Sequence, residues 1–138
     1  MTLLILAGTL ALIGAGVFVL MWQHRARHRD LVLLRQMGPL MEELWRPLRF
    51  LSDLRVTWPG LTKEQQAEIE DSVTYKDGFH ERRANEYAGR VRELSRRLGS
   101  WRHWRLRARL IEFLDAHGAK EPDELKVLIV MVRRHAGT

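Results

Sequence analysis

Cysteine is absent from the 138-residue chain, which excludes disulfides, thiolate metal sites and cysteine nucleophiles. Lysine is scarce, because the 23 basic residues comprise 19 Arg and only 4 Lys. Arg is suited to bidentate phosphate binding, but the same excess is typical of a GC-rich genome's codon usage, which is the explanation we favour. The net charge of +6 favours anionic partners without choosing one.

Charge is absent from the first 23 residues. The uncharged run from Thr2 to Trp22 would form a helix about 31 Å long, which matches the hydrocarbon core of a bilayer. It therefore predicts a transmembrane anchor over residues 1–23. A cleaved signal peptide is the alternative, but that would need a basic start and a shorter apolar stretch.

Small residues recur along one side of this predicted anchor. They form a strip where another transmembrane helix could approach closely, although Ala and Gly that face only lipid would give the same pattern. The residues of this candidate helix-packing strip are Ala7, Gly8, Ala11, Gly14 and Ala15.

Basic residues follow the predicted anchor, whereas no Lys or Arg precedes it in the sequence. The positive-inside rule therefore predicts an inner-membrane protein with its N-terminus out and its C-terminal part cytoplasmic. We expect residues 24–38 to form a basic juxtamembrane arm. The residues expected to contact lipid there are Trp22, Arg25, Arg27 and Arg29.

Apolar residues continue at helical spacing beyond the arm. The stripe consists of Leu34, Met37, Met41, Leu44, Leu48 and Leu51. Gly38-Pro39 is predicted to end one helix and begin another, and Pro47 to kink or restart it. We accordingly place a helical cytoplasmic domain at residues 39–138.

The remainder of the chain also reads as helices separated by breaks. Thr62 and Gln65 have the spacing of a capping box. Further helices are predicted from Asp77-Gly78 to Gly99, from Trp101 to about His117 with Gly118 as its C-terminal stop, and from Pro122 onward. The run LKVLIVMV in the last segment could alternatively be a buried strand, but we favour helix. The predicted fold class is all-α: one transmembrane helix followed by a bundle of four or five helices.

Three Arg, at positions 83, 90 and 97, lie seven residues apart beside the apolar seam of the 78–99 helix. The acidic face of the preceding helix, formed by Glu64, Glu68 and Asp71, could pair with them. We favour such intramolecular pairing over a ligand site for this row.

The segment from Phe79 to Arg109 carries ten Arg and three Glu, with aromatic residues between them. Such a surface could bind nucleic acid or anionic lipid. Trp101 and Trp104 are nevertheless expected to be core residues rather than base-stacking platforms. The candidate polyanion-binding residues are Arg82, Arg83, Arg90, Arg92, Arg96, Arg97, Arg102, Arg105 and Arg109.

Catalytic signatures are weak throughout the sequence. Asp77, His80 and Glu81 come closest to a metal site, but no second cluster supplies the remaining ligands. His103 and His117 have no local nucleophile partner. We expect no enzymatic activity, no metal and no cofactor.

The leading functional hypothesis is a non-enzymatic, single-pass adaptor or accessory subunit of a membrane-associated protein complex. The first alternative is a membrane tether for nucleic acid or anionic lipid. The second is a phage-type lysis or envelope factor, which would require the opposite orientation in the membrane.

Overall fold

The computed structural model describes residues 1–72, 78–116 and 120–137. These residues form five α-helices and two short 3₁₀ helices, and they contain no strand. The predicted all-α fold is therefore confirmed. Asp77, His117 and Gly118, which the sequence analysis singled out, lie outside the described residues.

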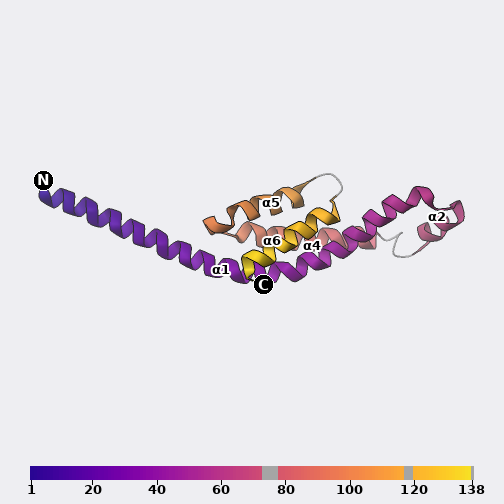
Figure 1. Ribbon diagram of the computed structural model, residues 1–138, viewed down its shortest axis with the longest axis horizontal. Helices are drawn as coiled ribbons and strands as arrows, with labels where there is room; N and C mark the ends of the chain where they lie inside the picture. Colours follow the sequence, from indigo (N-terminus) through magenta and orange to yellow (C-terminus); the bar gives the residue numbers. More distant parts are fainter. Residues whose placement is uncertain (73–77, 117–119, 138) are drawn as a thin grey trace.

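Helix α1 (Thr2–Thr57) runs unbroken from the apolar segment through the whole length of the bundle. The predicted helix boundary at Gly38-Pro39 is wrong, and Pro47 does not restart the helix either. A proline inside a helix loses one backbone hydrogen bond and causes a bend. Gly38 and Pro47 are buried against the neighbouring helices, and this packing holds the helix together across both prolines. Figure 1 shows α1 bending, without a break, where it meets the bundle.

Helices α4 (Phe79–Arg97), α5 (Trp104–Asp115) and α6 (Pro122–Ala136) pack with α1 into a bundle. α4 and α6 contact α1 directly, whereas α5 packs on α4 and α6 and lies furthest from α1 in Figure 1. The predicted stripe supplies the α1 side of the core, with four side chains fully shielded from solvent. These are Leu34, Met37, Met41 and Leu44.

Packing against the bundle begins well before residue 39. Ala26, Asp30 and Leu33 of α1 are already buried. Residues 24–38, expected to be a separate arm, are therefore a structural part of the bundle. The bundle begins within one helical turn of the end of the apolar segment.

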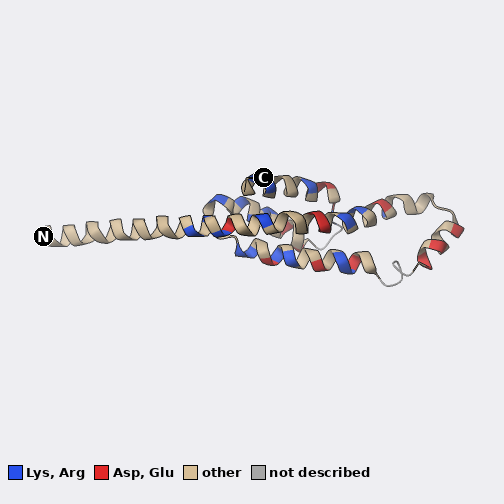
Figure 2. Ribbon diagram, turned by 90° about the horizontal axis from the view of Figure 1, so that it is seen from below, with Lys and Arg blue, Asp and Glu red and all other residues tan. Residues whose placement is uncertain are grey.

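Beyond the bundle, α1 continues to a 3₁₀ turn, η1 (Trp58–Gly60), and the short helix α2 (Lys63–Glu70). The predicted capping box is confirmed: the Gln65 N–H donates to Thr62 Oγ1 at 3.2 Å, and the Thr62 N–H donates to Gln65 Oε1 at 3.0 Å. Neither η1 nor α2 contains a buried residue. We call residues 53–72 the distal tip, which projects past the other helices in Figures 1 and 2.

Helix α6 confirms the helical interpretation of the LKVLIVMV segment. Pro122 occupies its first turn, and Gly137 ends it with a positive φ of 76° that a residue with a side chain rarely adopts. Acidic residues in its first turn and basic residues in its last turn oppose the helix dipole, as expected.

Helix α5 differs from its prediction at the N-terminal end. Ser100 does act as a cap, but for a 3₁₀ turn, η2 (Trp101–His103), and α5 begins only at Trp104. Trp101 and Trp104 were expected in the core, yet they are 65% and 61% exposed. Apolar residues occur on two sides of this helix, and only the side with Leu106 and Leu110 faces the core, because α5 lies on the outside of the bundle.

Residues 2–22 of α1 are all exposed and project away from the bundle (Figure 1). They are long and apolar enough to cross a membrane. We refer to residues 1–23 as the anchor segment.

Replacing Pro39 by Ala tests the continuity of α1. The substitution restores a backbone N–H at an exposed helical position, so we expect a gain of about 1–3 kcal/mol in unfolding free energy. Chemical denaturation of the full chain in detergent micelles, followed by tryptophan fluorescence, measures this gain. A loss of stability would instead show that the bend imposed by Pro39 is needed for packing.

Candidate functional site at the anchor end of the bundle

Asp30 is fully buried on the same face of α1 as the apolar stripe. Its two carboxylate oxygens accept hydrogen bonds from the backbone N–H groups of Gly99, at 3.1 Å, and Ser100, at 2.8 Å. Both donors belong to the connection between α4 and η2, where the backbone has left one helix and not yet entered the next. Asp30 thereby holds this connection against α1 and pairs with the partly buried N–H of Gly99 and the buried N–H of Ser100.

A second contact ties the same connection to the end of the anchor segment. The Trp101 N–H donates to Gln23 Oε1 at 3.3 Å. Gly99 also lies close to α1: a Cβ added there would come within 3.2 Å of the Arg29 guanidinium. The end of the bundle is therefore fixed beside the residues that immediately follow the anchor segment.

Two histidines meet at this end of the bundle. His103, buried in η2, and His135 of α6 approach with their Nδ1 atoms 2.8 Å apart. One Nδ1 must donate a proton and the other must accept it, so the contact requires at least one neutral ring. Protonating both rings would place two donors face to face.

Both histidines resist protonation in this environment. Burial is the main cause that lowers the pKa of His103 below its usual 6.5; His135, Arg102 and Arg27 lower it further, and the Asp30 carboxylate opposes the shift. Burial likewise lowers the pKa of His135, with Arg102 and Arg134 adding to the effect. The pair is therefore a neutral structural contact at pH 7.

The residues predicted to contact lipid lie at the junction of anchor and bundle. Trp22 is 49% exposed, and Arg25, Arg27 and Arg29 are exposed as well. The predicted helix-packing strip, Ala7, Gly8, Ala11, Gly14 and Ala15, lies on the exposed anchor segment, where nothing in the described part of the chain covers it.

The nine candidate polyanion-binding Arg are distributed along α4, η2 and α5. Four of them pair with carboxylates of this chain: Arg83 with Glu43 at 3.8 Å, and, at 2.7 Å each, Arg90 with Glu86, Arg92 with Asp115, and Arg97 with Glu93. Intramolecular pairing of the 83, 90 and 97 row is thus confirmed, but its partners lie on α1 and α4, not on the predicted acidic face of residues 64–71. Arg109 contacts the Met131 sulfur at 3.1 Å.

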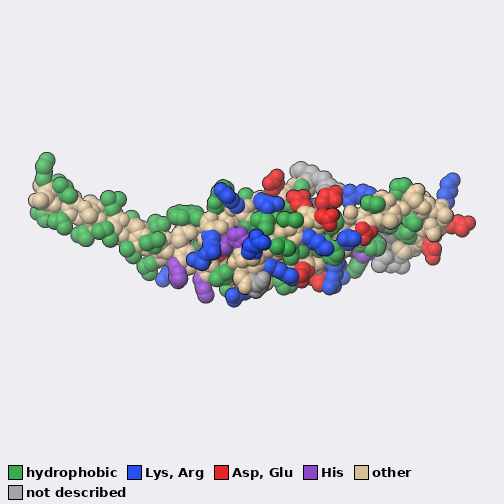
Figure 3. All heavy atoms as spheres, viewed as in Figure 1, with side chains coloured by type: hydrophobic (Ala, Val, Ile, Leu, Met, Phe, Trp, Pro, Cys, Tyr) green, Lys and Arg blue, Asp and Glu red, His purple; other side chains and the backbone are tan. Residues whose placement is uncertain are grey.

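Arg82, Arg96, Arg102 and Arg105 have no carboxylate within ion-pair distance among the described residues. Arg102 and Arg105 adjoin the exposed Trp101 and Trp104, and the Arg105 guanidinium lies 5.4 Å from the centre of the Trp104 ring. Figure 3 shows basic side chains predominating over the end of the bundle next to the anchor, with acidic ones further along. The anchor end is therefore both basic and aromatic.

The remaining candidate for metal chemistry finds no support from neighbouring ligands. His80 stacks on Phe50, with ring centroids 3.9 Å apart. Within residues 1–72, 78–116 and 120–137, no three His, Asp or Glu side chains converge in a way that could hold a metal ion.

The chain has no match among protein-family models, curated proteins or solved structures. The protein can therefore be classified only by its architecture. It is a helical bundle in which one helix is the continuation of an apolar segment long enough to cross a membrane.

Gln23, Asp30 and His135 are members of this site that were not predicted from the sequence. A signal for Asp30 was present, because it is the first acidic residue of the chain and lies one helical turn before Leu34 on the core stripe. A lone acid in that register indicates a buried hydrogen-bonding role. The pairing of His103 with His135 had no local signal, since 32 residues separate them.

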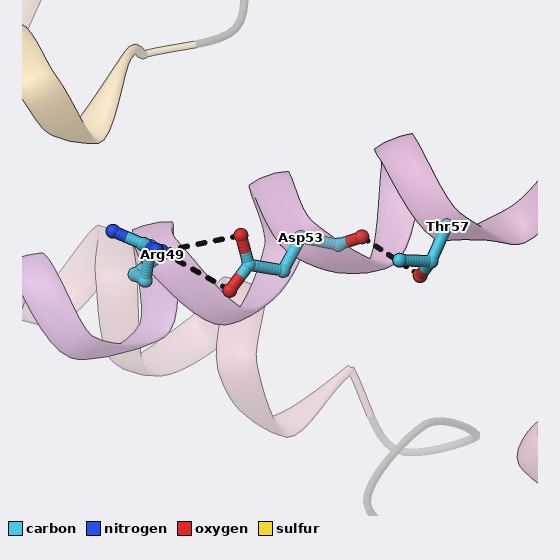
Figure 4. A network of polar contacts seen from close by, with 3 residues as sticks. All are labelled: Arg49, Asp53 and Thr57. Atoms are coloured by element: carbon cyan, nitrogen blue, oxygen red, sulfur yellow. Dashed lines mark hydrogen bonds and ion pairs between the residues drawn. The ribbon is translucent and has the colours of Figure 1, made fainter.

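Asp30→Asn should lower the unfolding free energy by about 1–3 kcal/mol, because an amide provides one acceptor where the fold uses two. The matched control is Asp53→Asn on the same helix. Asp53 is exposed. It is bound to Arg49, whose Nε lies 3.1 Å from both carboxylate oxygens (Figure 4). We expect the control to change stability by less than about 1 kcal/mol. Equal effects in the two variants, measured by denaturation in micelles, would remove Asp30 from this role.

Acidification should destabilise the bundle through the histidine pair. Because the folded protein holds both pKa values below 6.5, the unfolded chain binds more protons as the pH falls. The contribution of the histidine pair to stability is therefore fully present above pH 6.5 and is lost as the pH falls below that value. Thermal melts between about pH 7.5 and 5 should show a shallower decline in His135→Gln than in the wild type. His28→Gln, which changes an exposed histidine, should keep the wild-type slope.

Proposed function

We propose that the protein is a non-enzymatic, single-pass membrane adaptor that holds a partner protein at a fixed height above the inner membrane. The observation that carries the proposal is the unbroken course of α1 from the anchor segment to the distal tip. A continuous helix whose buried face runs from Ala26 to Leu48 transmits position and orientation, which is what a spacer or scaffold needs. From Trp22 to Thr57 it extends about 50 Å at 1.5 Å per residue.

The orientation belongs to the proposal. Exposed Arg25, Arg27 and Arg29 directly after the anchor segment favour a cytoplasmic bundle and an N-terminus outside. In this orientation the bundle and distal tip face the cytoplasm.

Two exposed surfaces are available to partners. In the membrane, the strip from Ala7 to Ala15 would let a partner helix pack closely against α1. In the cytoplasm, the distal tip contributes nothing to the core, since η1 and α2 bury no residue. The tip also carries four acidic residues and one Lys between Trp58 and Ser72, and Val56 is 77% exposed. A partner with a basic, partly apolar surface would complement it.

The test begins with purification of the tagged full chain in mild detergent, with a moderate-salt wash. We expect a protein partner at constant stoichiometry. Ala11→Leu with Ala15→Leu fills the strip and should reduce recovery of a membrane partner. Thr9→Leu with Gly16→Leu adds bulk on the opposite side of the same helix and serves as the control.

Equal recovery with both double variants would exclude the strip as the contact. Recovery of nucleic acid alone, released by high salt, would contradict the adaptor proposal and support the tether. Glu64→Lys with Glu68→Lys tests the distal tip in the same assay, because reversed charge should release a cytoplasmic partner.

A further inference from the structure

Two exposed tryptophans at the anchor end of the bundle have no role in the fold. Trp101 and Trp104 lie in η2 and at the start of α5, on the side opposite the buried Leu106 and Leu110. A Trp ring contributes some 150–250 Å² of surface when it is buried. Two such rings exposed together, beside a membrane-length helix, indicate a surface that is covered in the working protein.

The hydrogen bond from the Trp101 N–H to Gln23 fixes the position of these rings relative to the anchor. Gln23 immediately follows Trp22, so Trp101 lies level with Trp22 along α1 to within about one helical turn of 5.4 Å. Asp30 secures the same connection through Gly99 and Ser100. If the anchor segment crosses a bilayer, Trp101 and Trp104 are therefore held at its surface, to one side of α1.

The chemistry of this surface matches that of phospholipid headgroups. Tryptophan is enriched at membrane interfaces, where the ring lies among acyl carbonyls and the indole N–H stays hydrated. Arg102 and Arg105 adjoin the rings and have no carboxylate partner among the described residues, and the Arg105 guanidinium lies near the Trp104 face. Arg can bind lipid phosphate in a bidentate manner. A protein partner would need to reach these rings within the headgroup layer, so lipid is the occupant that fits the position.

We propose that Trp101 and Trp104 insert into the headgroup region of the same bilayer that α1 crosses, beside Trp22, while Arg102 and Arg105 bind lipid phosphates. The bundle is then attached to the membrane at two points, the anchor segment and this tryptophan end, which fixes its rotation about α1. This inference rests on the membrane crossing in the proposed function.

The absence of cysteine allows a direct measurement of depth, since any single cysteine introduced is the only site of labelling. A nitroxide is placed at Trp101→Cys or Trp104→Cys, each variant keeping the other tryptophan. The full chain is reconstituted into vesicles of equal parts phosphatidylcholine and phosphatidylglycerol. Collision with oxygen, which enriches in the bilayer, is compared with collision with a water-soluble nickel chelate.

Two matched labels calibrate the result. Leu10→Cys reports whether the anchor segment is inside the bilayer, and Val130→Cys reports a bundle position that is 55% exposed, close to the exposure of the tryptophans. We expect positions 101 and 104 to report headgroup depth, position 10 the bilayer interior, and position 130 water. The inference would be overturned if positions 101 and 104 were as accessible to nickel as position 130 while position 10 lay deep in the bilayer. That result would leave the membrane crossing intact. Position 10 in water would instead contradict the crossing itself.

A second measurement tests whether the tryptophans hold the bundle to the bilayer, with a variant that should fold normally. Trp101→Ser with Trp104→Ser should leave the helical content unchanged, because neither ring is in the core. A label at Ala108→Cys, one turn beyond Trp104 on the same face of α5, should then gain nickel accessibility at least twofold. Unchanged accessibility would show that the tryptophans do not hold the bundle to the bilayer.

Discussion

The packing of this protein depends on one buried face of α1 that begins where the apolar anchor segment ends. Ala26, Leu34 and Met41 all lie on that face, and α4 and α6 are both positioned by contact with it. A domain and the segment that precedes it are usually joined by an exposed, flexible linker. Here the helix of the anchor segment itself continues as one side of the bundle core, so the orientation of the bundle follows from the orientation of the anchor segment.

The polar residues at the anchor end give this arrangement its register. An apolar face allows helices to slide by a turn with little change in buried area, whereas the Asp30 carboxylate is satisfied only when Gly99 and Ser100 present their N–H groups to it. The contact between His103 and His135 constrains α6 in the same way. These few directional contacts determine which residues of η2 lie level with the end of the anchor segment, and hence where the exposed tryptophans lie.

Local patterns in the sequence predicted local structure well. The Thr62–Gln65 capping box and the helical LKVLIVMV segment depend on neighbours within a few residues and were predicted correctly. The predicted helix break at Gly38-Pro39 was wrong because burial of α1 against the other helices outweighs the backbone hydrogen bond lost at the proline. The prediction that Trp101 and Trp104 are core residues was wrong because the sequence does not tell which of two apolar sides of α5 meets the core. The Asp30 and histidine contacts join segments 69, 70 and 32 residues apart, beyond the reach of periodicity.

If the anchor segment crosses a bilayer as proposed, the length of α1 beyond it acts as a lever arm. With about 50 Å of helix past Trp22, a change in anchor tilt of about 10° would displace the distal end sideways by about 9 Å. Helix tilt responds to the match between hydrophobic length and bilayer thickness. A thinner or thicker membrane would therefore move the distal tip unless a second attachment resisted the swing, and the tryptophan end, offset to one side of α1, has the geometry of such a brace.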